Sequence, residues 1–279
     1  MSNTRRTFLG AVAGSLAAAA APEAKPVKYV RYRHSGGVSY GILDGETIRE
    51  IRGDLFGKHT ETGSRRKLSE VKLLYPCEPP KVLAVGLNYK SHIGARPAPK
   101  NPELFFKATT CLVDPEGNIV IPEGANNVHY EAELVVVMGK KAKNVSVADA
   151  PNHIFGYTCG NDVSERDWQK NDLQWFRAKG SDTFAPLGPA IVTSLNPNAR
   201  LSLRLNGQVK QTQLISDLLF DCANVVSFCS RFVTLMPGDV IYTGTPGATS
   251  AMKPGDIVEV EIEGIGVLRN KVVDHAGRS

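Results

Sequence analysis

Two glutamates, Glu131 and Glu133, stand two residues apart at the start of an apolar run that ends at Met138. The run is rich in valine, a pattern typical of a buried β-strand. Side chains alternate between the two faces of a strand, so both carboxylates are expected on the same side. Two carboxylates held together lose hydration and repel each other, so the pair needs a compensating cation or a shared proton.

A third carboxylate, Asp162, follows shortly after the apolar segment 154–157. A set of three carboxylates indicates a hard cation, Mg²⁺ or Mn²⁺, because such ions prefer oxygen ligands. The alternative is that Glu131 and Glu133 belong to the solvated face of an edge strand. A bare Glu-x-Glu pattern favours that alternative, so the metal hypothesis depends on the rest of the chain.

The composition is that of an ordinary globular protein. The chain has 279 residues, of which 42% are hydrophobic and 22% charged, with a net charge of +5. No basic run alternates with aromatic residues, so nucleic-acid binding is not indicated. The five cysteines show no Cys-x-x-Cys spacing and indicate neither a zinc site nor a disulfide framework.

Residues 1–25 resemble a twin-arginine export signal. Arg5 and Arg6 precede Phe8 and a short stretch of small residues, which is followed by Pro22. The stretch is shorter than the roughly 20 residues that a membrane span requires. The prediction is export by the twin-arginine route to a periplasmic or other extracytoplasmic location, with cleavage near Ala21 and no membrane span afterwards.

The remaining chain divides into two predicted parts. Residues 26–79 form a small N-terminal domain and a linker, with strands at 27–32 and 38–43 and an exposed polar loop at 57–67. Residues 80–275 form the main domain. Within it, apolar residues at helical spacing predict one long helix over 217–234, capped by Ser216, and alternation predicts a hairpin over 258–273. The predicted fold class is therefore mixed α/β and β-rich.

Six short motifs occur in one order within the main domain, and as a set they resemble the fumarylacetoacetate hydrolase family. The resemblance covers roughly residues 80–275. The motifs are Gly86-Leu87-Asn88-Tyr89-x-x-His92, Leu104-Phe105-Phe106-Lys107, Tyr130-Glu131-x-Glu133-Leu134, Gly160-Asn161-Asp162-Val163-Ser164-x-Arg166-Asp167-x-Gln169, Arg177-Ala178-Lys179-Gly180-x-Asp182-Thr183-Phe184, and Tyr242-Thr243-Gly244-Thr245-Pro246.

The resemblance implies a fold and a chemistry. The fold is a β-roll that wraps a central helix, with a small N-terminal domain, in a homodimer. The substrate is a small 2-oxo or 1,3-diketo acid bound to Mg²⁺ or Mn²⁺. Members of the family hydrolyse C–C bonds, decarboxylate oxo acids, isomerise dienoates or split ureidoglycolate.

The resemblance also implies roles for single residues. Glu131, Glu133 and Asp162 match the metal ligands, and Lys179 matches the active-site lysine. Further matches to pocket-lining and substrate-binding positions are Arg166, Gln169 and Thr245. Two alternatives stay open on the sequence alone: Arg166 forms a structural ion pair with Asp167 or Glu165, and Thr245 is only a turn residue.

His92 matches the histidine that activates water as a general base in hydrolytic members. Those members place a glutamate three residues further on, where this chain has Ala95. The nearest acid downstream, Glu103, fits no role in the family. Loss of the acid weakens the assignment as a hydrolase and favours chemistry without activated water.

The function predicted first is metal-dependent hydrolysis of a C–C bond in an acylpyruvate-like acid. The second prediction is a non-hydrolytic member of the family: a 2-hydroxyhepta-2,4-diene-1,7-dioate isomerase, an oxo-acid decarboxylase or a ureidoglycolate lyase. A third is a non-catalytic protein that binds a metal and an oxo acid.

Overall fold

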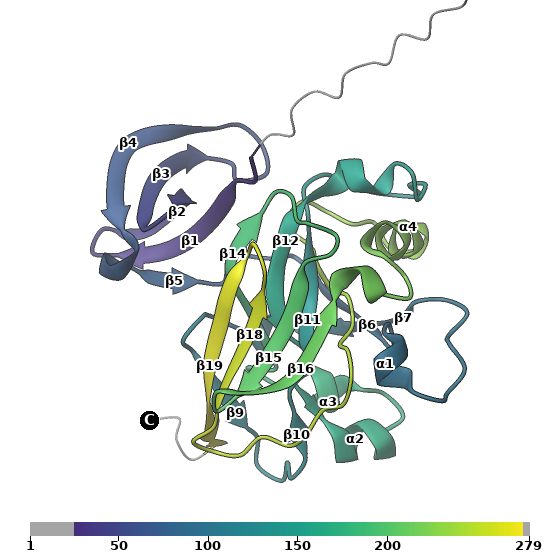
Figure 1. Ribbon diagram of the computed structural model, residues 1–279. Helices are drawn as coiled ribbons and strands as arrows, with labels where there is room; N and C mark the ends of the chain where they lie inside the picture. Colours follow the sequence, from purple (N-terminus) through teal and green to yellow (C-terminus); the bar gives the residue numbers. More distant parts are fainter. Residues whose placement is uncertain (1–24, 276–279) are drawn as a thin grey trace, which may run out of the picture.

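The structure of the chain, a computed structural model, describes residues 25–275 and consists mainly of β-strands (Figure 1). In this part of the chain, a mixed sheet of 12 strands packs against a second sheet of five strands. The core between them contains aliphatic side chains from both sheets, such as Leu134, Ile191 and Val260. The predicted β-rich mixed fold is confirmed.

Ten strands of the large sheet follow one another in a single hydrogen-bonded order, and the two remaining strands pair to its side. The order is β4 (His59–Lys67), β3 (Thr47–Gly53), β2 (Gly37–Asp44), β1 (Lys28–His34), β14 (Ala185–Val192), β12 (Ile154–Asn161), β11 (Ala132–Met138), β17 (Val240–Tyr242), β6 (Val82–Gly86) and β7 (Glu103–Lys107), with β5 (Lys72–Leu74) paired to β1 and β8 (Leu112–Val113) paired to β14.

The second sheet contains the predicted C-terminal hairpin. Its order is β16 (Gln208–Leu214), β15 (Arg200–Leu205), β18 (Ile257–Ile262), β19 (Gly266–Asp274) and β9 (Asn118–Ile121). A separate short pair is formed by β10 (Val128–His129) and β13 (Ser164–Glu165). Four α-helices lie among the described residues: α1 (Lys90–Ile93), α2 (Arg166–Asn171), α3 (Phe176–Gly180) and α4 (Cys222–Phe232).

Strand β11, which carries Glu133, lies in the interior of the large sheet between β12 and β17. All seven of its residues are buried. Val135 and Val137 pack in the core between the sheets, whereas Val136 and Met138 pack on the opposite side against α4. The strand is therefore not an edge strand, and the alternative of a solvated acidic face is excluded.

The N-terminal strands continue the large sheet. Lys28 and Tyr29 of β1 pair in antiparallel register with Val192 and Ile191 of β14. The polar segment 57–67, predicted as a loop, is mostly strand β4, because its backbone pairs with β3 while most of its side chains stay exposed. A separate N-terminal domain remains a prediction.

Helix α4 is shorter than the predicted helix over 217–234. It begins at Cys222, and the N-cap is Asp221, whose carboxylate accepts a hydrogen bond from Asn224 N at 2.8 Å. In place of the expected first turn the chain forms a short 3-10 helix, Ile215–Asp217, after which Leu218 bridges to Tyr89 and Leu219 N donates to Asn88 O at 2.8 Å. Tertiary pairing thus overrides helical periodicity here.

The long helix lies on the outer side of the large sheet (Figure 1). Val225, Val226 and Cys229 pack against side chains of β6, β11 and β17, while Phe232 is 69% exposed. The sheet therefore covers one side of α4 and does not enclose it, in contrast to the predicted central helix.

No helix in residues 25–275 has the length and apolar character needed to cross a bilayer. Residues 1–24 of the predicted export signal lie outside the described residues.

Candidate metal centre

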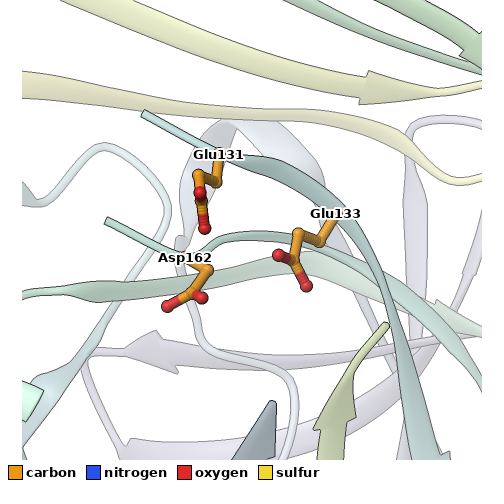
Figure 2. A group of neighbouring side chains, drawn as sticks. All are labelled: Glu131, Glu133 and Asp162. Carbon is orange, nitrogen blue, oxygen red and sulfur yellow. The ribbon is translucent and has the colours of Figure 1, made fainter. Parts of the chain in front are cut away.

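Three carboxylates converge in the interior of the molecule. Glu133 lies in β11, Glu131 in the short link between β10 and β11, and Asp162 directly after β12. At least one carboxylate oxygen of each lies within 4.8 Å of one from each of the others, and none of the three residues is more than 4% exposed. Figure 2 shows the carboxyl groups turned toward a common space. The sheet register produces this arrangement, because Ala132 pairs with Asn161 and Asp162 N then donates to Glu131 O at 2.9 Å.

Three basic side chains contact two of these carboxylates. Lys179 Nζ, from α3, lies 2.6 Å from Glu131 Oε2 and 2.6 Å from Asp162 Oδ2. Lys107 Nζ, from the end of β7, lies 2.5 Å from Asp162 Oδ1 and also donates to the carbonyl oxygen of Lys179. Arg166 Nη2, from α2, lies 2.5 Å from Glu131 Oε1. Glu131 and Asp162 are thus each bound by two cationic groups.

Glu133 has a different environment, since it forms no ion pair with a residue of the described part of the chain. Its Oε2 accepts a hydrogen bond from Gly244 N at 2.7 Å. Gly244 has a φ of +105°, and a Cβ atom there would lie 2.7 Å from Asn88 Cβ, so this approach requires glycine.

The pKa values follow from these contacts. Burial raises the pKa of Glu133 well above its ordinary value, and the negative charges of Asp162 and Glu131 add to the effect. Burial alone would also raise the pKa of Glu131, but the charges of Lys179 and Arg166 outweigh it and lower that pKa. For Lys179, burial opposes the charged form, yet Asp162 and Glu131 raise its pKa, so it stays an ammonium ion.

These observations fit a divalent cation. The candidate ligands are all carboxylate oxygens, which Mg²⁺ and Mn²⁺ prefer. One of them, Glu133, is a carboxyl group whose pKa is raised by burial and by the negative charges of Asp162 and Glu131. A cation among the three carboxylates would supply a compensating positive charge.

Arg166 is held in a polar network. Its Nη1 donates to Gln169 Oε1 at 2.7 Å and its Nη2 to Thr249 Oγ1 at 3.0 Å. Thr249 in turn lies 2.8 Å from His129 Nδ1. Burial and the charge of Arg166 lower the pKa of His129 to about 4, so this imidazole is neutral. The alternative pairing of Arg166 with its sequence neighbours is not the one found, since its ion pair is with Glu131.

His92 is oriented by the backbone. Its Nδ1 lies 2.7 Å from the carbonyl oxygen of Gly247. A carbonyl oxygen only accepts, so Nδ1 carries a hydrogen, and in the neutral imidazole the lone pair is then on Nε2. Ala95 therefore deprives His92 of a carboxylate three residues further on, but not of an orienting hydrogen bond. Glu103 is exposed and lines a different cavity, next to Phe106.

Seven of the eight predicted site residues line one cavity of about 40 Å³: His92, Glu131, Glu133, Arg166, Gln169, Lys179 and Thr245. The eighth, Asp162, is bonded to Lys179. Trp175 also lines the cavity and packs edge-on against Phe105, with ring centroids 5.3 Å apart.

Sequence reasoning assigned no role to two buried residues of this region, Lys107 and Gln211. Lys107 closes the apolar motif Leu104-Phe105-Phe106-Lys107, and a lysine at the end of a strand is normally exposed. Gln211 lies in a strand whose neighbouring residues are mostly exposed. No local pattern marks either residue, because their partners are distant in sequence.

Comparison with known proteins gives two family matches. Residues 81–273 match the family model described as fumarylacetoacetate (FAA) hydrolase C-terminal. Residues 27–76 match a model described as Rv2993c-like, N-terminal.

Individual relatives are similar over most of the chain. Protein Rv2993c of Mycobacterium tuberculosis is 46% identical, over 85% of this chain and 94% of the relative. The mitochondrial oxaloacetate tautomerase FAHD2A of Bos taurus is 42% identical, over 74% of this chain and 70% of the relative. The crystal structure of 2-hydroxyhepta-2,4-diene-1,7-dioate isomerase from Mycobacterium marinum is 42% identical with a TM-score of 0.84, over 89% and 99% of the two chains.

The prediction of export is wrong on this comparison. The bovine tautomerase is a mitochondrial enzyme by name, and the similarity to it and to the mycobacterial protein gives no support for a periplasmic location.

Proposed function

This chain belongs to the fumarylacetoacetate hydrolase family, a family of enzymes, and from that premise we propose that it interconverts tautomers or double-bond isomers of a small 2-oxo dicarboxylic acid. The proposed metal ligands are Glu131, Glu133 and Asp162, and the proposed cofactor is Mg²⁺ or Mn²⁺. The observation that carries the proposal is the buried cluster of carboxylates beside Lys179 and a histidine, His92, whose Nδ1 is bonded to a backbone carbonyl in place of a carboxylate.

The bound cation would polarise the 2-oxo group and stabilise the negative charge of the enolate. Lys179 and Arg166 add fixed positive charge on the same side, where it stabilises developing negative charge without reorganisation. His92 lines the cavity, and in its neutral form Nε2 would carry the lone pair that takes a proton from the carbon next to the oxo group. Return of that proton to the oxygen completes a keto–enol exchange, in which no water is consumed.

The charge of the site favours a substrate with two carboxylates. A bound cation would hold Glu133 ionised, and the charges of Glu131, Glu133 and Asp162 would then be balanced by those of Lys107, Lys179 and Arg166. With a divalent cation in place, two positive charges remain uncompensated. A dianion such as oxaloacetate matches that excess, and the tautomerase and the isomerase among the relatives are named for dicarboxylates.

Hydrolysis of an acylpyruvate is the second candidate, supported by the name of the matching family model. It shares the enolate with the first candidate but also requires an activated water molecule. His92 has the backbone carbonyl of Gly247, rather than a carboxylate, as its partner, and this makes it a weaker base for water. A binding protein without turnover is the third candidate.

The test follows the ultraviolet absorbance of enol-oxaloacetate, and in parallel the cleavage of an acylpyruvate, in Mg²⁺ and in Mn²⁺. We expect tautomerisation well above the buffer rate, weak hydrolysis, and loss of both activities in Glu133→Gln. Efficient hydrolysis without tautomerisation would favour the second candidate. Binding of Mn²⁺ and oxalate without any turnover would favour the third.

The homodimer remains a prediction. Sedimentation velocity of the purified protein would test it.

A further inference from the structure

Gln211 is a buried polar residue in a strand that is otherwise largely exposed. It is 3% exposed, whereas Lys210 and Thr212 on either side of it face solvent. Its side chain extends from β16 in the second sheet to β11 in the large sheet, the strand that carries Glu133. Oε1 accepts a hydrogen bond from Ala132 N at 3.0 Å, between the two candidate ligands Glu131 and Glu133.

The amide nitrogen of Gln211 contacts the other wall of the site. Nε2 donates to Thr245 Oγ1 at 2.9 Å and to Pro246 O at 2.6 Å. The orientation of the amide is determined by its partners, because Ala132 N only donates and Pro246 O only accepts. Of the 20 side chains, glutamine alone has this reach together with one acceptor and two donors. Methionine, of similar length, offers none of them.

These contacts determine how Thr245 can act. A hydroxyl group has one hydrogen to donate and rotates to suit its neighbours. Because Thr245 Oγ1 already accepts from Gln211, its own hydrogen must be donated elsewhere, and Thr245 lines the cavity with His92 and Lys179. A hydroxyl that donates into the cavity suits an anionic oxygen of a ligand.

We propose that Gln211 is a positioning residue that holds the Thr245 hydroxyl as a hydrogen-bond donor for a carboxylate or enolate oxygen of the substrate. The inference rests on the proposed function, since it requires an anionic ligand in the cavity. Gln211 acts through Thr245 and does not itself touch the ligand.

The experiment measures binding of oxalate, a planar dianion that resembles an enolate, to the Mn²⁺-loaded protein by calorimetry. The variants are Gln211→Met, Thr245→Val and the double variant, with Gln208→Met as the matched control on the exposed part of β16. A hydrogen bond to a charged group contributes about 1.5–3 kcal/mol, so each single variant should bind oxalate at least about tenfold more weakly. The double variant should bind oxalate no more than about twofold more weakly than Thr245→Val. Once the Thr245 hydroxyl is gone, Gln211 has no hydroxyl to position, so its own replacement adds little.

A second variant, Gln211→Glu, keeps the acceptor for Ala132 N but cannot donate to Thr245. Its carboxylate would accept the Thr245 hydrogen and turn it away from the cavity, so oxalate binding should again fall about tenfold or more. Mn²⁺ affinity, measured without oxalate, should stay within about twofold of wild type in all these variants.

Three outcomes overturn the inference. The first is oxalate binding by Gln211→Met and Gln211→Glu at wild-type strength. The second is a double variant whose loss equals the product of the two single losses, which means that Gln211 acts independently of Thr245. The third is failure of the wild-type protein to bind Mn²⁺ or oxalate, which overturns the proposed function and this inference with it.

Discussion

Lys107 Nζ lies 2.5 Å from Asp162 Oδ1, and neither side chain is more than 1% exposed. The same ammonium donates to the carbonyl oxygen of Lys179, so it joins the end of β7 to a candidate metal ligand and to α3. A buried ion pair is stabilised by the attraction of its members, and each becomes costly when the other is removed.

Replacing Lys107 with methionine should therefore destabilise the protein. The variant leaves Asp162 with one cationic partner, and loss of one member of a buried pair costs about 3–5 kcal/mol of the free energy of unfolding. The measurement is urea unfolding followed by circular dichroism. Lys100→Met, on an exposed position of the same chain segment, is the control and should change stability by less than about 0.5 kcal/mol. A Lys107→Met protein as stable as the control would show that the pair contributes nothing.

Removal of one carboxylate should abolish the response of stability to metal. Wild type should gain about 2.7 kcal/mol at a free Mn²⁺ concentration 100 times the Kd, and EDTA should reverse the gain. Glu133→Gln should gain nothing, and without metal it should be at least as stable as wild type, because burial and the charges of Asp162 and Glu131 disfavour the Glu133 carboxylate. Thermal unfolding with and without Mn²⁺ measures both. Glu103→Gln, which alters an exposed acid outside the cavity, should respond like wild type.

His92 should affect turnover without affecting binding. His92→Asn removes the base at Nε2, and general-base assistance is worth about 10² to 10⁴ in rate. We expect tautomerisation to fall in this range while the Kd of oxalate stays within about threefold of wild type. Equal losses in both measurements would indicate that the imidazole only shapes the cavity.

A glutamate introduced at Ala95 should favour hydrolysis. It would add negative charge near His92, whose present partner is the neutral carbonyl of Gly247, and so strengthen it as a base for water. Ala95→Glu should raise acylpyruvate hydrolysis more than it raises tautomerisation. Ala98→Glu adds the same charge at another exposed position of the loop and should change neither. Efficient hydrolysis by wild type, with no gain from Ala95→Glu, would mean that another group activates water.

The cysteines should be unreactive in the native protein. Burial raises the pKa of Cys77 and Cys229 to about 12 and that of Cys111 to about 11. With the chromogenic disulfide DTNB at pH 8, we expect no reaction of these thiols before unfolding and five thiols after it. Cys222 is only partly buried and lines a cavity, so any slow native reaction should disappear in Cys222→Ser.

The same thiols give the stability a pH dependence at high pH. An unfolded cysteine loses its proton near pH 8.5, whereas the buried thiols keep theirs to about pH 11–12. Between these values the native state binds more protons, so its stability, complete below pH 8.5, should fall as the pH rises. Urea unfolding at pH 8, 9 and 10 checks the sign, and a rise in stability over this interval would contradict it.

Much of the strand content and the candidate ligand set could be predicted from the sequence. Valine-rich and alternating runs identify β6, β11 and the hairpin of β18 and β19, because local apolar periodicity reflects a buried face directly. The acids at 131, 133 and 162 were recognised from their types and spacing and from the order of the family motifs.

Other features depend on contacts that no local pattern encodes. Helix α4 begins at Cys222, later than predicted. Asn88, more than 100 residues away, accepts hydrogen bonds from the backbone of Leu219 and Phe220, which precede the helix. The polar segment of β4 forms a strand because its backbone pairs with that of β3. Its polar side chains indicate that the segment is exposed, but they do not indicate whether it is a strand or a loop.

The site itself shows the same division. The sequence by itself determined which carboxylates were candidates, since their chemistry belongs to the residues. Only the tertiary structure decided that Lys107 and Gln211 join them, that Arg166 pairs with Glu131, and that a backbone carbonyl orients His92. These contacts join segments 35 to 155 residues apart, so the tertiary fold, rather than any local propensity, brings them together.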